Sequence, residues 1–137
     1  MRLCPVLGTA LQALGAAVRY GTSLSARARE MAILAVTAHA DCAFEWHAHE
    51  AVGRLTGLTA VDLAAIRAVF PLAGANEVQR TVVDVTFDLL RVGGLDEQSF
   101  QNAVSHLHPA GLQELMALVG HYRLLALQMR AFRVDAP

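Results

Sequence analysis

Residues 24–49 read LSARAREMAILAVTAHADCAFEWHAH, and this stretch decides the fold. Its apolar residues recur at helical spacing, and no part of it alternates for long as a strand would. Ser25 is a good N-cap, because its hydroxyl can accept a hydrogen bond from the free N–H groups of a first turn. The stretch therefore predicts one helix from Ser25 to about Ala38, a break at 39–41, and a second helix from Cys42.

Helical spacing and helix-end signals continue along the rest of the chain. Asp41 is expected to cap the second helix and Gly57 to stop it, and Thr59 with Asp62 resembles a capping box. Residues 82–86 have strand propensity, but their neighbours have helical spacing, so we expect helix there too. We predict an all-α fold in a single domain, 1–137, with about seven helices at 6–19, 25–38, 42–55, 60–69, 76–91, 96–106 and 109–132.

The composition is apolar and almost neutral. The net charge of -1 gives no electrostatic reason to expect binding to nucleic acid or to an anionic membrane surface. Hydrophobic residues make up 55% of a small chain, which is more than such a chain easily buries by itself. The best apolar run, 31–38, is far shorter than the roughly 20 residues of a membrane span. Pro5 interrupts the apolar core that a signal peptide would need. We therefore expect a soluble, cytoplasmic homo-oligomer with apolar interfaces.

Three residues with reactive side chains share one face of the helix that follows the break. Cys42, Glu45 and His49 lie at i, i+3 and i+7, so a thiol, a carboxylate and an imidazole could converge. A cysteine at a helix N-terminus is placed where the thiolate is favoured, and Glu45 could orient the ring of His49. Glu30, on the preceding helix, could reach the same pocket if the two helices form a hairpin. A buried cysteine beside a solvated Glu–His pair would show the same spacing without any site.

These residues also carry a family resemblance. The segments LSARARE at 24–30, AIL at 32–34, CAFEWHAH at 42–49 and GL at 57–58 resemble the core of the carboxymuconolactone decarboxylase and alkylhydroperoxidase D-like family. Its peroxidase branch carries Glu, eleven residues, and then Cys-x-x-Cys-x-x-x-His, and this pattern is met by Glu30, Cys42 and His49. Residues 88–122 resemble the later helices of larger members, many of which have a longer N-terminal segment. The resemblance implies the helical bundle of that family and a trimer or hexamer.

Two departures from the peroxidase pattern separate the branches of the family. Glu45 stands at the second cysteine position, so the thiol pair that would close into a disulfide is missing, and Phe44 stands where that branch often has His. The decarboxylase branch instead has a Glu and a His four apart on this helix, as Glu45 and His49 are. The resemblance therefore implies acid–base chemistry on a small carbonyl or lactone substrate, of decarboxylase or lyase type and without a cofactor.

Two other functions stay open. Cys42 could act as a thiol-dependent, peroxiredoxin-like peroxidase if another protein supplied the resolving thiol, because Cys4 is distant in sequence. The chain could also be an inactive binding or assembly protein that keeps the fold. Beside the four principal candidates, Glu30, Cys42, Glu45 and His49, we expect His39, Phe44, Trp46 and Tyr122 to line the pocket. The histidine spacing does not favour a metal site.

Overall fold

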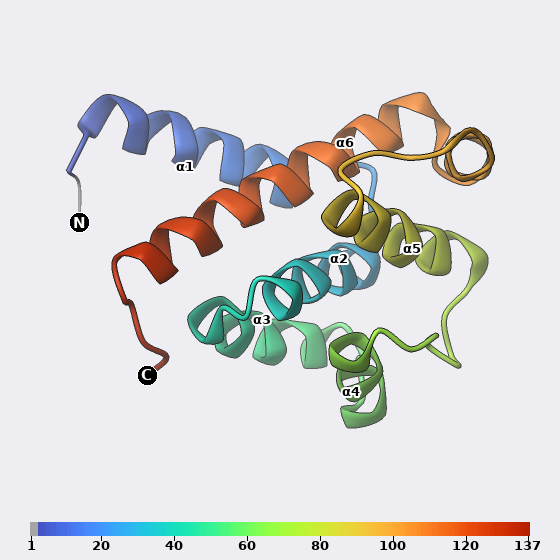
Figure 1. The fold of residues 1–137 in the computed structure, drawn as a ribbon, viewed down its shortest axis with the longest axis horizontal. Coiled ribbons are helices and arrows are strands. Elements are labelled where there is room, and N and C mark those ends of the chain that lie inside the picture. Colours follow the sequence, from blue (N-terminus) through green and yellow to red (C-terminus); the bar gives the residue numbers. More distant parts are fainter. Residues whose placement is uncertain (1–2) are drawn as a thin grey trace.

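The computed structural model describes residues 3–137, and in these residues it is all-helical, without a strand. Six helices follow one another along the chain (Figure 1). They are α1 (Pro5–Tyr20), α2 (Ala26–His39), α3 (Ala43–Leu55), α4 (Ala60–Ala68), α5 (Glu77–Arg91) and α6 (Glu97–Ala131). The predicted all-α fold is confirmed, and none of these helices is long and apolar enough to cross a membrane.

Helix α2 occupies the centre of the molecule. Its residues 31–37 are all buried, so this part of the helix is enclosed around its whole circumference, as expected of a helix with neighbours on every side. It packs against α3, α4, α5 and α6, and these helices surround it in Figure 1. The site helix α3 follows α2 after a short turn and packs back against it, as the predicted hairpin requires.

Most predicted helix ends are confirmed by their hydrogen bonds. Ser25 Oγ accepts from the backbone N–H of Ala28 at 3.1 Å. Thr59 and Asp62 form the complete capping box at the start of α4. Asn76 and Asp96 cap α5 and α6, each by accepting from the N–H three residues later. These side chains satisfy N–H groups that a helix start leaves without partners.

The start of α3 differs from the prediction. Its N-cap is Cys42, with extended backbone angles, and Asp41 lies one residue earlier with a φ of 50°. The left-handed region tolerates Asp better than most side chains, because its short polar group can bond locally. Asp41 therefore turns the chain between α2 and α3 and does not cap α3.

The last two predicted helices form one element with a break inside it. Helix α6 runs from Glu97 to Ala131, and His108 interrupts it with a φ of 61° and a ψ of 163°. Pro109 explains the position of the break, because proline disfavours helical angles in the residue before it and lacks a backbone N–H. The separation of the expected helices is thus real, although the chain resumes its helix directly after the break.

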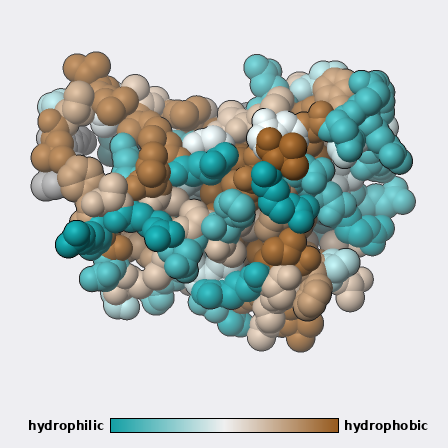
Figure 2. Space-filling view, viewed as in Figure 1, coloured by the Kyte–Doolittle hydropathy of each residue, from teal (hydrophilic) through white to brown (hydrophobic). Residues whose placement is uncertain are grey.

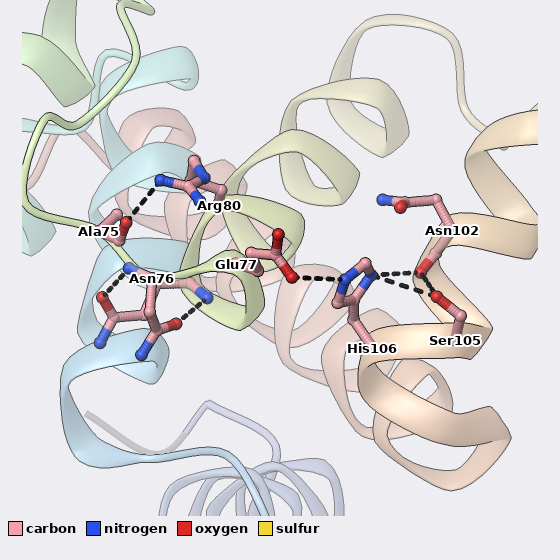
Figure 3. A network of polar contacts seen from close by, with 8 residues as sticks. Ala75, Asn76, Glu77, Arg80, Asn102, Ser105 and His106 are labelled. Atoms are coloured by element: carbon pink, nitrogen blue, oxygen red, sulfur yellow. Dashed lines mark hydrogen bonds and ion pairs between the residues drawn. The ribbon is translucent and has the colours of Figure 1, made fainter.

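A polar network on the surface joins α5 to α6. His106 Nε2 lies 3.3 Å from Glu77 Oε2, and His106 Nδ1 lies 2.9 Å from the carbonyl oxygen of Asn102 (Figure 3). In the same view, Arg80 donates to the carbonyl oxygen of Ala75 at 2.8 Å. The Glu77–His106 contact joins the first turn of α5 to the first half of α6, and none of these residues is a candidate site residue.

Candidate functional site

The packing of α3 on α2 brings three of the four principal candidates together. Glu30 comes from the first half of α2, and Glu45 and His49 come from one face of α3. His49 Nδ1 lies 2.8 Å from Glu30 Oε2, and His49 Nε2 lies 3.4 Å from Glu45 Oε2. One imidazole is therefore held between two carboxylates that contact its two different nitrogens.

This cluster is closed off from solvent. Glu30 is 2% exposed, and Glu45 and His49 are also buried. Ionised groups are rarely buried without partners, because removing a charge from water is unfavourable. The two short contacts supply those partners for the imidazole, and they fix which nitrogen faces which carboxylate.

The carboxylates also set the charge of the imidazole. Burial alone would lower the pKa of His49, but the hydrogen bond with Glu30, the contact with Glu45 and their charges outweigh it. The pKa of His49 is therefore raised above its usual 6.5. In the protonated form both ring nitrogens carry hydrogens, so His49 can donate to both carboxylates.

The raised pKa makes stability depend on pH in a defined direction. Below pH 6.5, His49 is protonated in the folded and unfolded states, and its full stabilising effect is present. Above that value the unfolded chain loses the proton first, so the effect disappears as pH rises through the folded-state pKa. We expect the free energy of unfolding, measured in urea, to fall over this range in the wild type. A His49→Gln variant that declines equally would contradict the assignment to His49.

Two aromatic side chains of α6 form a wall beside the cluster. The Tyr122 ring meets His49 edge to face, with centroids 5.1 Å apart, and His121 meets Tyr122 in the same way at 5.2 Å. Burial raises the pKa of Tyr122 to about 12, so it keeps its proton at neutral pH. Burial likewise lowers the pKa of His121, and its Nδ1 is buried without a hydrogen-bond partner among the described residues.

Helix α1 touches this wall through a glycine. A Cβ atom added to Gly15 would lie 3.0 Å from His121 Nε2, so the imidazole would have to shift by a few tenths of an ångström to accept it. The absence of a side chain at Gly15 therefore lets α1 approach the imidazole of His121. The prediction placed Tyr122 in the pocket, but Gly15 was not among its candidates.

Cys42, the fourth principal candidate, faces a different space. Its side chain is 3% exposed and lines a cavity of about 160 Å³ together with Trp46 and Arg67. The guanidinium of Arg67 lies 3.9 Å from the centre of the Trp46 ring, within the range of a cation–π contact. Among residues 3–137, no hydrogen bond joins the Cys42 thiol to the Glu30, Glu45 and His49 cluster. Nothing in the spacing of residues 42–49 indicated Arg67, which comes from α4.

The two remaining pocket candidates, His39 and Phe44, lie on either side of the turn between α2 and α3. His39 is exposed and lines a separate cavity of about 700 Å³ with Arg123 and Arg130 of α6. Phe44 is half-buried in the first turn of α3. In the part of the chain that the structure describes, no group of three His, Cys, Asp or Glu side chains is arranged to hold a metal ion.

Comparisons with known proteins agree with this architecture. Residues 5–88 match the sequence model of the carboxymuconolactone decarboxylase family. A protein of unknown function from Agrobacterium tumefaciens, described as a candidate antioxidant defence protein AhpD, superposes with a TM-score of 0.88 over 99% of this chain and 94% of its own, at 17% identity. An uncharacterised peroxidase-related protein from Silicibacter sp. TM1040 gives a TM-score of 0.77 over 90% of this chain and 66% of its own, at 20% identity. At these identities the likeness concerns the fold. No curated protein matches the sequence significantly.

Proposed function

Because the chain belongs to the carboxymuconolactone decarboxylase family, we propose that it is a cofactor-independent acid–base enzyme of decarboxylase or lyase type. Its substrate is a small molecule with a carbonyl or lactone group. The observation that carries the proposal is the imidazole of His49 held between Glu30 and Glu45, with a raised pKa. An imidazole that keeps its proton to higher pH than usual can serve as the acid that such a reaction needs.

The two carboxylates have different parts in the proposal. Glu30 lies close to His49, at 2.8 Å, and orients the ring through Nδ1. Glu45 lies farther away, at 3.4 Å from Nε2, so a substrate oxygen can replace Glu45 as the acceptor of the Nε2–H hydrogen bond. Glu45 is then free to move a proton at the carbon next to the substrate carbonyl.

In a 3-oxo acid, the carbonyl group lies at the carbon β to the carboxylate, so the carbonyl can accept the electrons that decarboxylation releases. The bond to the carboxylate carbon breaks, carbon dioxide leaves, and the electron pair moves into an enolate. His49 donates its Nε2 proton to the enolate oxygen, which removes the developing charge in a site shielded from water. A proton from solvent then adds to the carbon, the carbonyl re-forms, and the enol O–H proton returns to Nε2 of His49, so one proton is taken up for each carbon dioxide released.

A direct assay tests this function. The purified chain is incubated with a panel of small 3-oxo acids and carboxylated lactones, and carbon dioxide release and ring opening are followed. We expect turnover that persists in the presence of EDTA. Failure with the whole panel, combined with peroxide turnover that depends on Cys42, would contradict the proposal.

A thiol peroxidase is the second candidate, because Cys42 lines a cavity beside a guanidinium. In this reaction the thiolate attacks a peroxide oxygen, the O–O bond breaks, and Cys42 becomes a sulfenic acid while an alcohol leaves. An external thiol then forms a mixed disulfide with Cys42 and releases water, and a second thiol restores the cysteine. The peroxidase-related name of one structural neighbour agrees with this chemistry.

Mass spectrometry after mild peroxide treatment distinguishes the two candidates. For the acid–base enzyme we expect Cys42 to stay reduced, because the thiol is almost completely buried. Cys4 is exposed and serves as the internal control for oxidation in the same molecule. A sulfenic acid that forms faster at Cys42 than at Cys4 would favour the peroxidase. An inactive binding protein would keep its fold and show neither activity.

A further inference from the structure

A cavity that is separate from the His49 cluster lies where three helices meet. It has a volume of about 700 Å³ and is formed by the end of α2, the end of α5 and the second half of α6. His39 lines it from α2, and Arg123 and Arg130 line it from α6. The reaction proposed above uses none of these three side chains, so their meeting at one cavity needs a separate explanation.

The spacing of residues along α6 places both arginines on one face of that helix. Arg123, Leu127 and Arg130 stand at i, i+4 and i+7, positions that share a helix face. The two arginines are thus about two turns apart, roughly 10 Å along the helix axis, and both reach the same cavity. Hydrophilic and hydrophobic side chains lie next to one another over the second half of α6 (Figures 1 and 2).

The charge around this cavity is unbalanced. Among the described residues that line it, no Asp or Glu faces the two guanidinium groups. A different cavity, of about 600 Å³ beside α5, is also lined by two arginines, but Asp84 and Asp88 balance their charge there. Like charges around one cavity repel each other, and the low-dielectric protein around them concentrates their field. An anion inside the cavity would relieve this repulsion.

A structural role accounts for part of one cation and for none of the other groups. Arg130 Nη1 donates to the carbonyl oxygen of Ala40 at 2.6 Å, so this arginine satisfies a carbonyl that the end of α2 leaves open. A guanidinium has five N–H donors, so Arg130 keeps others for a ligand. Among residues 3–137, no hydrogen bond or ion pair involves the side chain of His39 or of Arg123.

The rest of the cavity wall is largely apolar. Leu90, which is 7% exposed, lines it from α5, and Leu124 and Leu127 line it from α6. Small-molecule pockets have volumes of roughly 300–1,000 Å³ and combine apolar walls with a few polar groups, as this cavity does. Arginine binds carboxylates and phosphates through two parallel N–H bonds. The cavity therefore matches a ligand with an oxyanion at one end and a hydrocarbon body.

We propose that this cavity binds a small amphipathic organic anion. Its carboxylate or phosphate group pairs with Arg123 and Arg130, and its hydrocarbon part packs on the leucines of the wall. The net charge of -1 gives the chain no general attraction for anions, so the binding comes from the cations at this cavity. The inference does not depend on the reaction proposed for the His49 cluster.

Isothermal titration calorimetry with octyl phosphate and with octanoate, each below its micelle concentration, tests the binding. The wild-type chain is expected to bind at least one of these anions saturably and to bind octylamine, which has the opposite charge, not at all. Inorganic phosphate is expected to bind at least about tenfold more weakly, because each buried CH₂ group contributes roughly fourfold in affinity. No binding of either anion, or equal binding of octylamine or of inorganic phosphate, would overturn the proposal.

Arg123→Gln tests whether the anion lies in this cavity. Arg123 is exposed, so the variant is expected to keep its helix content by circular dichroism and to raise the dissociation constant about tenfold or more, since a hydrogen bond to a charged group is lost. Arg91→Gln is the matched control, because Arg91 is also exposed but lines the other cavity beside α5. An equal loss in both variants would show that anions are attracted by charge alone and would contradict the site.

Two further measurements separate this cavity from other anion sites. Binding is expected to survive in His49→Ala, and its loss in a folded His49→Ala variant would place the anion at the His49 cluster instead. The chain is also expected to stay in solution when phosphatidylcholine–phosphatidylglycerol vesicles are sedimented. Sedimentation with the vesicles that octyl phosphate does not reverse would assign the cations to a lipid surface and would exclude a free ligand.

Discussion

Replacing His49 with Ala is expected to lower turnover by about 10²–10⁴-fold, the usual contribution of a positioned proton donor. The substitution removes the imidazole that Glu30 and Glu45 hold at 2.8 and 3.4 Å. The rate of carbon dioxide release at saturating substrate is the appropriate measurement, because the proposed role concerns the chemical step and not binding alone.

His47→Ala is the matched control for this experiment. His47 lies on the same helix two residues earlier, is exposed, and contacts none of the cluster. We expect it to retain wild-type turnover. If His49→Ala and His47→Ala lose the same activity, or if neither loses any, His49 is not the acid.

Replacing Glu30 with Ala is expected to lower the free energy of unfolding by about 3 kcal/mol near pH 6. Removing one partner of a buried pair typically costs roughly 3–5 kcal/mol, and Glu45 remains to reduce the loss. The loss is expected to shrink at higher pH, because His49 can then give up its proton. Urea denaturation at the two pH values measures both effects.

Glu50→Ala tests whether the loss of stability in Glu30→Ala is caused by the burial of its ion pair. Glu50 Oε1 lies 3.1 Å from Arg54 Nη2 on the same helix, but this pair is open to solvent. Exposed pairs contribute about 0–1 kcal/mol, so a small loss is expected. A comparable loss in both variants would contradict the distinction between the buried and the exposed pair.

Local signals in the sequence were sufficient to predict the helices and two of the three cluster residues. Ser25 and the Thr59–Asp62 pair cap helices because short polar side chains meet the nearest free N–H groups, which is a local effect. Glu45 and His49 meet because residues four apart on a helix are neighbours. The prediction that Glu30 joins the cluster required one further assumption, that α2 and α3 pack as a hairpin.

The remaining features depend on geometry that residue spacing does not contain. Cys42 was placed on the face of Glu45 by helical spacing, but as the N-cap it has φ and ψ of -101° and 94° and leaves the helical register. Its neighbour Arg67 and the wall residue His121 come from α4 and α6, so their positions follow from how the helices pack. A single sequence gives no direct signal for such long-range contacts.

Gly15 links the position of α1 to the aromatic wall beside the site. The residue at position 15 must be small, because a Cβ atom there would meet His121 Nε2 at 3.0 Å. A larger residue at position 15 would therefore displace the imidazole of His121 or move α1 away from α6. The sequence of α1 is thus constrained by the wall beside the site, although α1 carries none of the candidate site residues.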